Sequence, residues 1–465
     1  MTDDDLCWRN AVELAGLIRD RKVSPVDVVK SLLARIERLE PQLNAFITVT
    51  GDSALAAART AEAEAARGTF RGPLHGVPFG LKDVIDVRGV LTTGHSRILR
   101  DNIATEDAEV TRRLAAAGAI LIGKNSTHEF AFGGPAFDLP WPPARNPWNR
   151  DRSPGGSSSG SAVAVTAGMV PAAIGTDTGG SIRNPATSCG IVGMKPSFGR
   201  ISRHGVFPLS SSLDTIGLLT RDVAGNALLL NAISGHRPGE PGSADQPVPD
   251  FLGNIDRTIA GLKIGVIRHF YMRDMVAADE VSAAIEAALA VLAGLGAEVI
   301  DVETAPLREF TDCYKSIVPP EGAAIHEKWL KERPQDYAAI TRAKLSPGFE
   351  VRAVDYLSAL QKRQALKAQM DELARSVDVM VTASAMDQPF LIADQADMDR
   401  FQPRNARNPF SVTGHPALSL PIGFSAAGLP LAMQIAGRYW EESVIYQVAH
   451  AYEQATSWHD KRPPI

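Results

Sequence analysis

The sequence has few of the features that mark secreted, membrane-embedded or nucleic-acid-binding proteins. Its 465 residues include three cysteines, Cys7, Cys189 and Cys313, and an odd number of widely spaced cysteines forms neither a disulfide framework nor a metal-ligand cluster. The net charge of −5 provides no basic footprint for nucleic acid or an anionic membrane. No apolar run reaches the roughly 18 residues of a membrane span. We therefore expect a cytoplasmic protein that acts on a small molecule, with no nucleic-acid or membrane partner.

Short apolar stretches alternate with helical patterns over most of the chain, which predicts an α/β fold. We find neither an internal repeat nor a break between two cores, so we expect a single domain over residues 1–465 with a catalytic core at about 70–225. Strands are predicted at 76–84, 119–122, 262–267, 297–302, 377–382, 417–424 and 431–436, and helices at 26–39, 53–66, 108–117, 280–295, 352–374 and 442–455.

Two segments rich in glycine and serine, residues 153–161 and 175–183, carry the densest chemical signal. Glycine allows positive φ and lets several backbone N–H groups turn toward one point, and beside a serine such a concavity is an oxyanion hole. Thr178, Gly179, Gly180 and Ser181 can supply these N–H groups. A single loop of this composition is more often a flexible connection, but here an apolar stretch at 162–174 joins the two and predicts that they are held together.

A serine hydroxyl needs a base, and Lys82 is the candidate that the sequence offers. None of the ten histidines falls in a pattern that pairs with these serines. Lys82 lies in the apolar run from Gly76 to Ile85, where a solvated ammonium would be out of place. A buried lysine loses its charge readily and can act as a base near neutral pH.

These segments resemble the amidase signature family. The resemblance rests on both glycine-serine loops, on Gly76–Asp83 and on the Lys-Pro-Ser-Phe-Gly-Arg sequence at Lys195–Arg200, and it extends to Thr413–Pro421. It implies an α/β fold with a large mixed central β-sheet flanked on both sides by α-helices.

The resemblance also implies a Ser–cis-Ser–Lys triad, with Ser181 as nucleophile, Ser157 as bridging serine and Lys82 as base. Serine–lysine pairs are a known variant of triad chemistry. The Gly156–Ser157 peptide is then expected to be cis. By the same analogy, Asp177 and Arg183 brace the oxyanion loop, Ala131 lies in the substrate pocket, and no metal or cofactor is needed.

Three functions fit these residues. The first is a free-standing amidase acting on a small carboxylic amide, with esters or carbamates also open. The second is the glutaminase subunit of a glutamine-dependent tRNA amidotransferase, a related group that carries an acidic residue where this chain has the arginine-rich stretch 404–416. The third, a binding protein without activity, is disfavoured because the whole triad is present. The oligomeric state stays open, a homodimer included.

Overall fold

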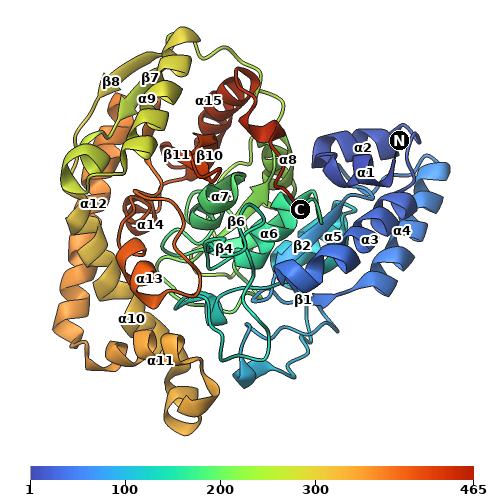
Figure 1. The fold of residues 1–465 in the computed structure, drawn as a ribbon, viewed down its shortest axis with the longest axis horizontal. Helices are drawn as coiled ribbons and strands as arrows, with labels where there is room; N and C mark the ends of the chain where they lie inside the picture. Colours follow the sequence, from blue (N-terminus) through green and yellow to red (C-terminus); the bar gives the residue numbers. More distant parts are fainter. Residues whose placement is uncertain (1) are drawn as a thin grey trace.

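A mixed sheet of 11 strands forms the centre of the computed structural model, which describes residues 2–465 (Figure 1). The strands are β1 (Phe46–Val49), β2 (Pro78–Lys82), β3 (Ile120–Asn125), β4 (Ala172–Asp177), β5 (Val192–Lys195), β6 (Thr215–Thr220), β7 (Lys263–Val266), β8 (Glu298–Asp301), β9 (Val379–Ala383), β10 (Ala417–Phe424) and β11 (Pro430–Ala436). Their order across the sheet is β1-β3-β2-β4-β6-β5-β10-β11-β9-β7-β8. Strand β2 pairs in parallel with both β3 and β4, and β7 with both β8 and β9, whereas the other neighbours are antiparallel.

Helices cover the sheet and fill the ends of the molecule. They are α1 (Asp3–Trp8), α2 (Ala11–Arg19), α3 (Pro25–Leu43), α4 (Gly51–Ala66), α5 (Glu109–Ala116), α6 (Ser159–Thr166), α7 (Arg183–Cys189), α8 (Val223–Ile233), α9 (Asp279–Gly294), α10 (Leu307–Glu332), α11 (Ala339–Leu345), α12 (Ala353–Ser376), α13 (Gln395–Phe401), α14 (Asn408–Thr413) and α15 (Glu442–Gln454). Short helical turns include η2 (Glu129–Ala131) and η5 (Ser346–Glu350). Figure 1 shows α6 and α7 over the middle of the sheet.

Both faces of the sheet are buried. Successive side chains of a strand point to opposite faces. On β4 the buried side chain of Ile174 belongs to one apolar cluster and that of Ala173 to another, and Leu218 and Leu219 on β6 divide in the same way. Two cores therefore lie on the two sides of one sheet, as the fold predicted from the resemblance requires.

Most predicted elements are present within two or three residues of their expected bounds. The helix expected at 26–39 begins with Pro25 after the N-cap Ser24, whose hydroxyl accepts a hydrogen bond from the N–H of Val26, and it continues to Leu43. Helix α10 was not predicted because Pro319 and Pro320 interrupt its pattern. Within residues 2–465 the structure contains no helix with both the length and the apolarity to cross a bilayer.

Candidate active site

Lys82 is the last residue of β2, in the interior of the sheet. Its side chain has no exposed surface, and burial lowers its pKa from 10.5 to about 7, although Asp214 and Asp177 oppose that shift. The Nζ atom donates hydrogen bonds to Ser157 Oγ at 2.8 Å and to Thr176 Oγ1 at 2.8 Å. This amine therefore titrates near neutral pH, within hydrogen-bonding distance of the Ser157 hydroxyl.

A second buried lysine shows why partners matter as much as burial. Burial and the nearby Arg183 lower the pKa of Lys195 to about 7 as well. Its Nζ donates to the carbonyl oxygen of Pro196 at 2.9 Å, and Lys195 does not line the cavity that contains Ser157 and Ser181. Only Lys82 of the two is bonded to a hydroxyl of the glycine-serine loops.

The loop before α6 holds Ser157 rigidly. The Gly156–Ser157 peptide bond is cis, as expected. The carbonyl oxygen of Ser157 accepts from the N–H of His128 at 3.1 Å and from Thr127 Oγ1 at 2.8 Å. A Cβ at position 156 would lie 2.1 Å from His128 Cε1, so only glycine fits beside the imidazole.

Ser181 lies on the turn between β4 and α7. Its carbonyl oxygen accepts a hydrogen bond from the N–H of Ser158 at 3.2 Å, which ties the two glycine-serine loops together. Ser157 and Ser181 line the same cavity. The structure thus brings together the three residues that were expected to form the triad. Lys82 is hydrogen-bonded to Ser157, and Ser157 and Ser181 line one cavity.

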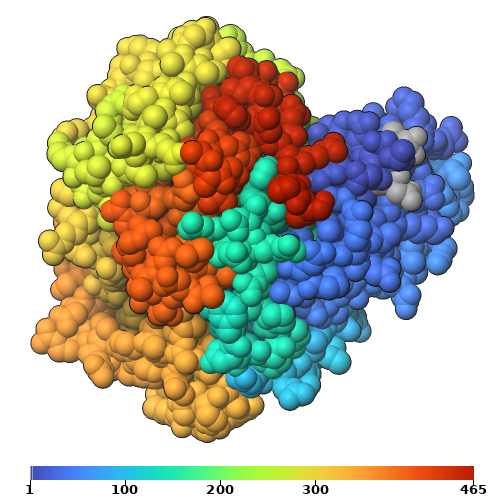
Figure 2. All heavy atoms as spheres, in the orientation of Figure 1, coloured from blue at the N-terminus to red at the C-terminus, as the bar shows by residue number. Residues whose placement is uncertain are grey.

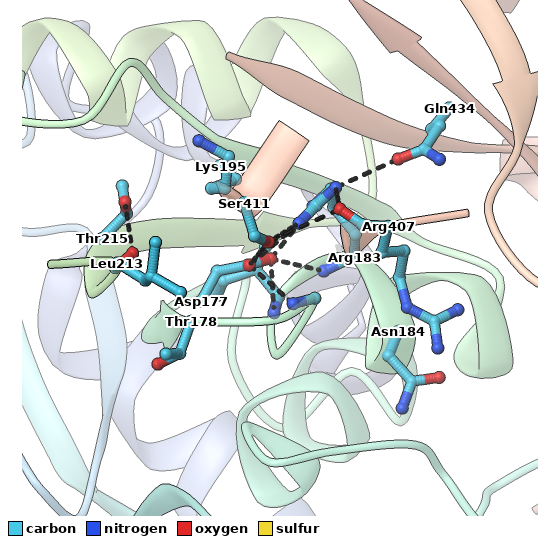
Figure 3. Close-up of polar contacts among 12 residues, drawn as sticks. Asp177, Thr178, Arg183, Asn184, Lys195, Leu213, Thr215, Arg407, Ser411 and Gln434 are labelled. Atoms are coloured by element: carbon cyan, nitrogen blue, oxygen red, sulfur yellow. Dashed lines mark hydrogen bonds and ion pairs between the residues drawn. The ribbon is translucent and has the colours of Figure 1, made fainter. Parts of the chain in front are cut away.

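Asp177 and Arg183 hold the turn that carries Ser181 (Figure 3). The Asp177 carboxylate accepts from the N–H groups of Gly180 at 2.8 Å and Ile182 at 3.2 Å, and it pairs with the Arg183 guanidinium at 3.0 Å. Burial raises the pKa of Asp177, but Arg183, Lys195 and the N–H of Ile182 together outweigh burial and hold this pKa at about 2. The guanidinium also donates to Ser411 Oγ at 2.7 Å, so the turn is anchored to α14.

The N–H groups of this turn differ in their hydrogen-bond partners. The N–H of Gly180 is bonded to Asp177, so it is not available to an oxyanion. Thr178 donates its hydroxyl to Asp214 and lines a separate cavity of about 250 Å³. Gly179, Gly180 and Ser181 line the cavity with Ser157. No acceptor within residues 2–465 takes the N–H of Gly179 or Ser181, so both groups are available to an oxyanion. The bond from the Thr178 hydroxyl does not engage the N–H of Thr178.

The cavity has a volume of about 460 Å³, enough for a small organic molecule. Its floor is the turn 179–181 and its walls come from distant parts of the chain. Ala131, which was expected in the substrate pocket, lines this cavity and also the one beside Thr178. Phe132 lines the cavity, whereas Phe130 is buried among Phe207, His326, Trp329 and Tyr337 and does not.

Figure 2 shows one face on which the orange segment near residue 395 lies beside the teal segment near residue 150. Two hydrogen bonds join these segments: the N–H of Ser153 donates to the carbonyl of Phe390 at 2.8 Å, and that of Ile392 to Asp151 at 2.9 Å. Residues from both segments, 153–157 and 390–408, line the cavity. The late segment therefore belongs to the site, although its sequence carries no catalytic motif.

Sequence reasoning missed several cavity residues, above all Tyr314 and Arg407. A Cβ at position 179 would lie 2.5 Å from Tyr314 Cε2, and one at position 180 would lie 2.6 Å from Arg407 Nε. Both side chains therefore pack directly against the turn of Ser181. The pair of glycines at 179–180 was the one local signal that large side chains approach there.

Known proteins resemble this chain over nearly its whole length. A family model described as Amidase matches residues 27–445. A glutamyl-tRNA(Gln) amidotransferase subunit from Moorella thermoacetica is 37% identical, with 99% of each chain covered. The subunit of the same name from Thermotoga maritima has a structure with a TM-score of 0.79 at 32% identity, covering 98% of this chain and 94% of that one. A 6-aminohexanoate cyclic dimer hydrolase complexed with substrate superposes with a TM-score of 0.87 at 30% identity, covering 98% and 99%. This chain belongs to the amidase family, the enzymes of the amidase signature.

Proposed function

We propose that this chain hydrolyses a carboxamide bond through an acyl-enzyme on Ser181. The observation that carries the proposal is the buried Lys82 amine, 2.8 Å from the hydroxyl of Ser157, in a site where Ser157 and Ser181 face one cavity. Membership of a family of hydrolases that act on carbon–nitrogen bonds supports the reaction class.

The proposed mechanism follows from the protonation state of Lys82. The uncharged amine accepts a proton from Ser157 while Ser157 accepts one from Ser181, whose oxygen attacks the amide carbon. The N–H groups of Gly179 and Ser181 stabilise the negative charge that develops on the carbonyl oxygen. The lysine then returns its proton through Ser157 to the leaving nitrogen. A water molecule, deprotonated through the same relay, then attacks the acyl-enzyme and releases the carboxylic acid.

The first candidate is a free-standing amidase for a small amide. The solved neighbour named as a 6-aminohexanoate cyclic dimer hydrolase has the higher TM-score of the two neighbours described above. The chain's own α10 and residues 390–408 line the cavity, so this part of its wall comes from the same chain as Ser181. Because esters and carbamates pass through the same tetrahedral intermediate, they are further substrates to test.

The second candidate is the glutaminase subunit of a glutamyl-tRNA(Gln) amidotransferase. Relatives named as subunits of that enzyme match nearly the whole chain at 35–37% identity, and they favour this candidate over the first. If it holds, the chain releases ammonia from glutamine for partner subunits and a tRNA, and the expectation of no nucleic-acid partner fails. Against it, stretch 404–416 holds no acidic residue to bind the glutamine ammonium.

A labelling experiment tests the shared chemistry. A fluorophosphonate probe should label the purified chain, and Ser181→Ala should abolish both labelling and amide hydrolysis. The matched control is Ser53→Ala, which changes an exposed serine on α4 and should label as the native chain does. Full labelling of folded Ser181→Ala contradicts the proposal.

Ammonia release separates the two candidates. The purified chain is incubated with glutamine and with a panel of simple aliphatic and aryl amides, each alone and with extract of the source cells. Hydrolysis of simple amides without extract, and none of glutamine, supports the first candidate. Glutaminase activity that appears or rises strongly with extract supports the second.

A further inference from the structure

Arg407 is a buried arginine without an ionic partner at the catalytic turn. It is 4% exposed and lines the cavity that contains Ser181. One nitrogen, Nη1, donates to the carbonyl oxygen of Ser384 at 2.7 Å, whereas Nε is buried without an acceptor among the described residues. Within residues 2–465 no carboxylate forms an ion pair with this guanidinium.

The neighbouring charges make this arrangement costly. Burial, and next Arg183, lower the pKa of Arg407 to about 9, so it still carries its charge at neutral pH. Asp177 opposes this shift, but its carboxylate is paired with Arg183. In Figure 3 the guanidinium of Arg407 points away from Asp177, toward the side on which Asn184 lies. A buried charge without a counter-ion is rare in folded proteins, because burial favours the neutral state.

The position of Arg407 relative to Ser181 defines what a counter-ion would be. Nε and Cδ would lie 2.6 and 2.7 Å from a Cβ at Gly180, the residue before Ser181. The Arg407 side chain therefore packs against the turn next to Ser181. Because Nε itself is enclosed, an anion would bind at the η nitrogens of this guanidinium, beside that turn. A substrate could reach both the η nitrogens and Ser181 with a short chain between its anionic group and its amide carbon.

The other charges of the cavity argue against a substrate ammonium. Lys315 and Lys344 add two more cations to the lining, whereas Asp399 is the one carboxylate among the lining residues that the structure describes, and it is exposed. Lys344 already donates to the carbonyl oxygen of Gly133 at 2.7 Å and to Gln402. The potential of the cavity therefore favours a negatively charged acyl group without a compensating amine.

We propose that Arg407 binds a carboxylate on the acyl part of the substrate, so that the chain acts on the monoamide of a short dicarboxylic acid. Guanidinium and carboxylate groups match in geometry, and the substrate would supply the ion-pair partner that no carboxylate of residues 2–465 provides to Arg407. This inference rests on the proposed amide hydrolysis and names the substrate class of that same site. It makes Arg407 a specificity residue that lies outside the Ser–Ser–Lys relay.

Three matched amides test the proposal with the full-length chain. Glutaramate carries the carboxylate; 5-oxohexanamide replaces the carboxylate by a neutral methyl ketone; glutamine adds an ammonium to glutaramate. We expect kcat/KM for glutaramate to exceed that of both others, and Arg407→Gln to lower the glutaramate to 5-oxohexanamide ratio at least about tenfold, mainly through KM, since a hydrogen bond to a charged group is worth that much. Succinamate and malonamate define the preferred length.

Two further variants keep the result interpretable. Arg404→Gln removes an arginine of the same segment that pairs with Asp387 and does not line the cavity, so the substrate ratio should not change. Arg407→Lys should restore part of the ratio, which a purely structural role of Arg407 would not do. If Arg407→Gln does not fold, protection of the native chain answers the question: glutarate should slow fluorophosphonate labelling of Ser181 more than pentanoate does.

The outcomes separate this inference from the proposed function. If Ser181 is labelled and neutral amides are cleaved as well as glutaramate, amide hydrolysis stands and the carboxylate site is refuted. Equal protection by glutarate and pentanoate has the same meaning. If glutamine is preferred to glutaramate, the cavity accepts an ammonium beside the carboxylate, and the assignment of a substrate without an amine is wrong. If no amide is cleaved and Ser181 is not labelled, both proposals fail together.

Discussion

Replacing Lys82 by methionine should abolish activity and make the protein more stable. The two effects have one cause, the uncharged state of a lysine that has no exposed surface. The unfolded chain protonates this lysine readily, whereas the native protein must bury an amine that resists protonation. Methionine has a similar length and no charge to bury, so it should fill the same space without that penalty.

The magnitude follows from the change in the pKa of Lys82. Burial lowers it from 10.5 to about 7, and each pKa unit is worth about 1.4 kcal/mol. At pH 7, Lys82 is protonated in the unfolded state and about half protonated in the native state. This difference lowers the unfolding free energy of the native protein by about 4 kcal/mol. The variant loses the hydrogen bonds to Ser157 and Thr176, at about 2 kcal/mol together. The net gain in unfolding free energy is about 2 kcal/mol.

The gain should depend on pH in a defined direction. Because the folded pKa is below the unfolded one, the penalty is absent above pH 10.5, grows as the pH falls toward about 7, and is constant below that. The unfolding free energy of Lys82→Met should therefore exceed that of the native protein most at and below neutral pH. With about 2.1 cal/mol/K of unfolding entropy per residue, 465 residues convert 2 kcal/mol into a rise in Tm of about 2 °C.

Calorimetry and urea unfolding between about pH 6 and pH 10 measure both quantities. Lys30→Met, which changes an exposed lysine on α3, is the control and should show no such dependence. If Lys82→Met is no more stable than the native protein at pH 7, or if the difference does not shrink toward pH 10, Lys82 is charged in the native state. The base assigned to the reaction would then be wrong.

Three further predictions follow from the same site. The kcat/KM of the native enzyme should rise with pH and level off above about 7, the pKa of Lys82, being about tenfold lower one unit below it; a flat steady-state profile from pH 5 to 8 would contradict this. Asp177→Asn leaves the buried Arg183 guanidinium without its counter-ion, which should lower the unfolding free energy by about 3–5 kcal/mol in urea melts and slow fluorophosphonate labelling; native-like stability would show that the pair does not hold the turn. Gly179→Ala places a methyl group 2.5 Å from Tyr314 Cε2 and should reduce kcat at least about tenfold, with partial recovery on adding Tyr314→Ala; an unaffected kcat would show that the turn can shift freely.

The parts of the fold that sequence predicted well are those with local causes. Strand β10 has the predicted bounds, Ala417–Phe424, and β2 was identified from its apolar run. Helix α8 was missed because its side chains are apolar on nearly every face, which removes the helical period that reveals a surface helix. Helix α10 was missed because its prolines at 319 and 320 imitate a break.

The same distinction explains the site. Glycine-serine loops and a lysine in an apolar run are local patterns, so the candidates Lys82, Ser157 and Ser181 could be named from the sequence. Their catalytic roles, and the single domain with its core at about 70–225, stay predictions. Tyr314 and Arg407 lie more than 100 residues from Ser181 along the chain, and only tertiary packing brings them to it. No local pattern distinguishes them from structural residues.

The cavity draws its floor and its walls from different stretches of the chain. The proposed relay and the turn that carries it lie between residues 82 and 183, whereas Tyr314, Phe401 and Arg407 lie between 311 and 408. Substitutions in the later stretch can therefore change substrate specificity while the residues proposed for catalysis stay the same. A chimaera that carries residues 305–416 from another family member should take on the acyl-group specificity of the donor. It should keep the pH–rate profile of the present chain.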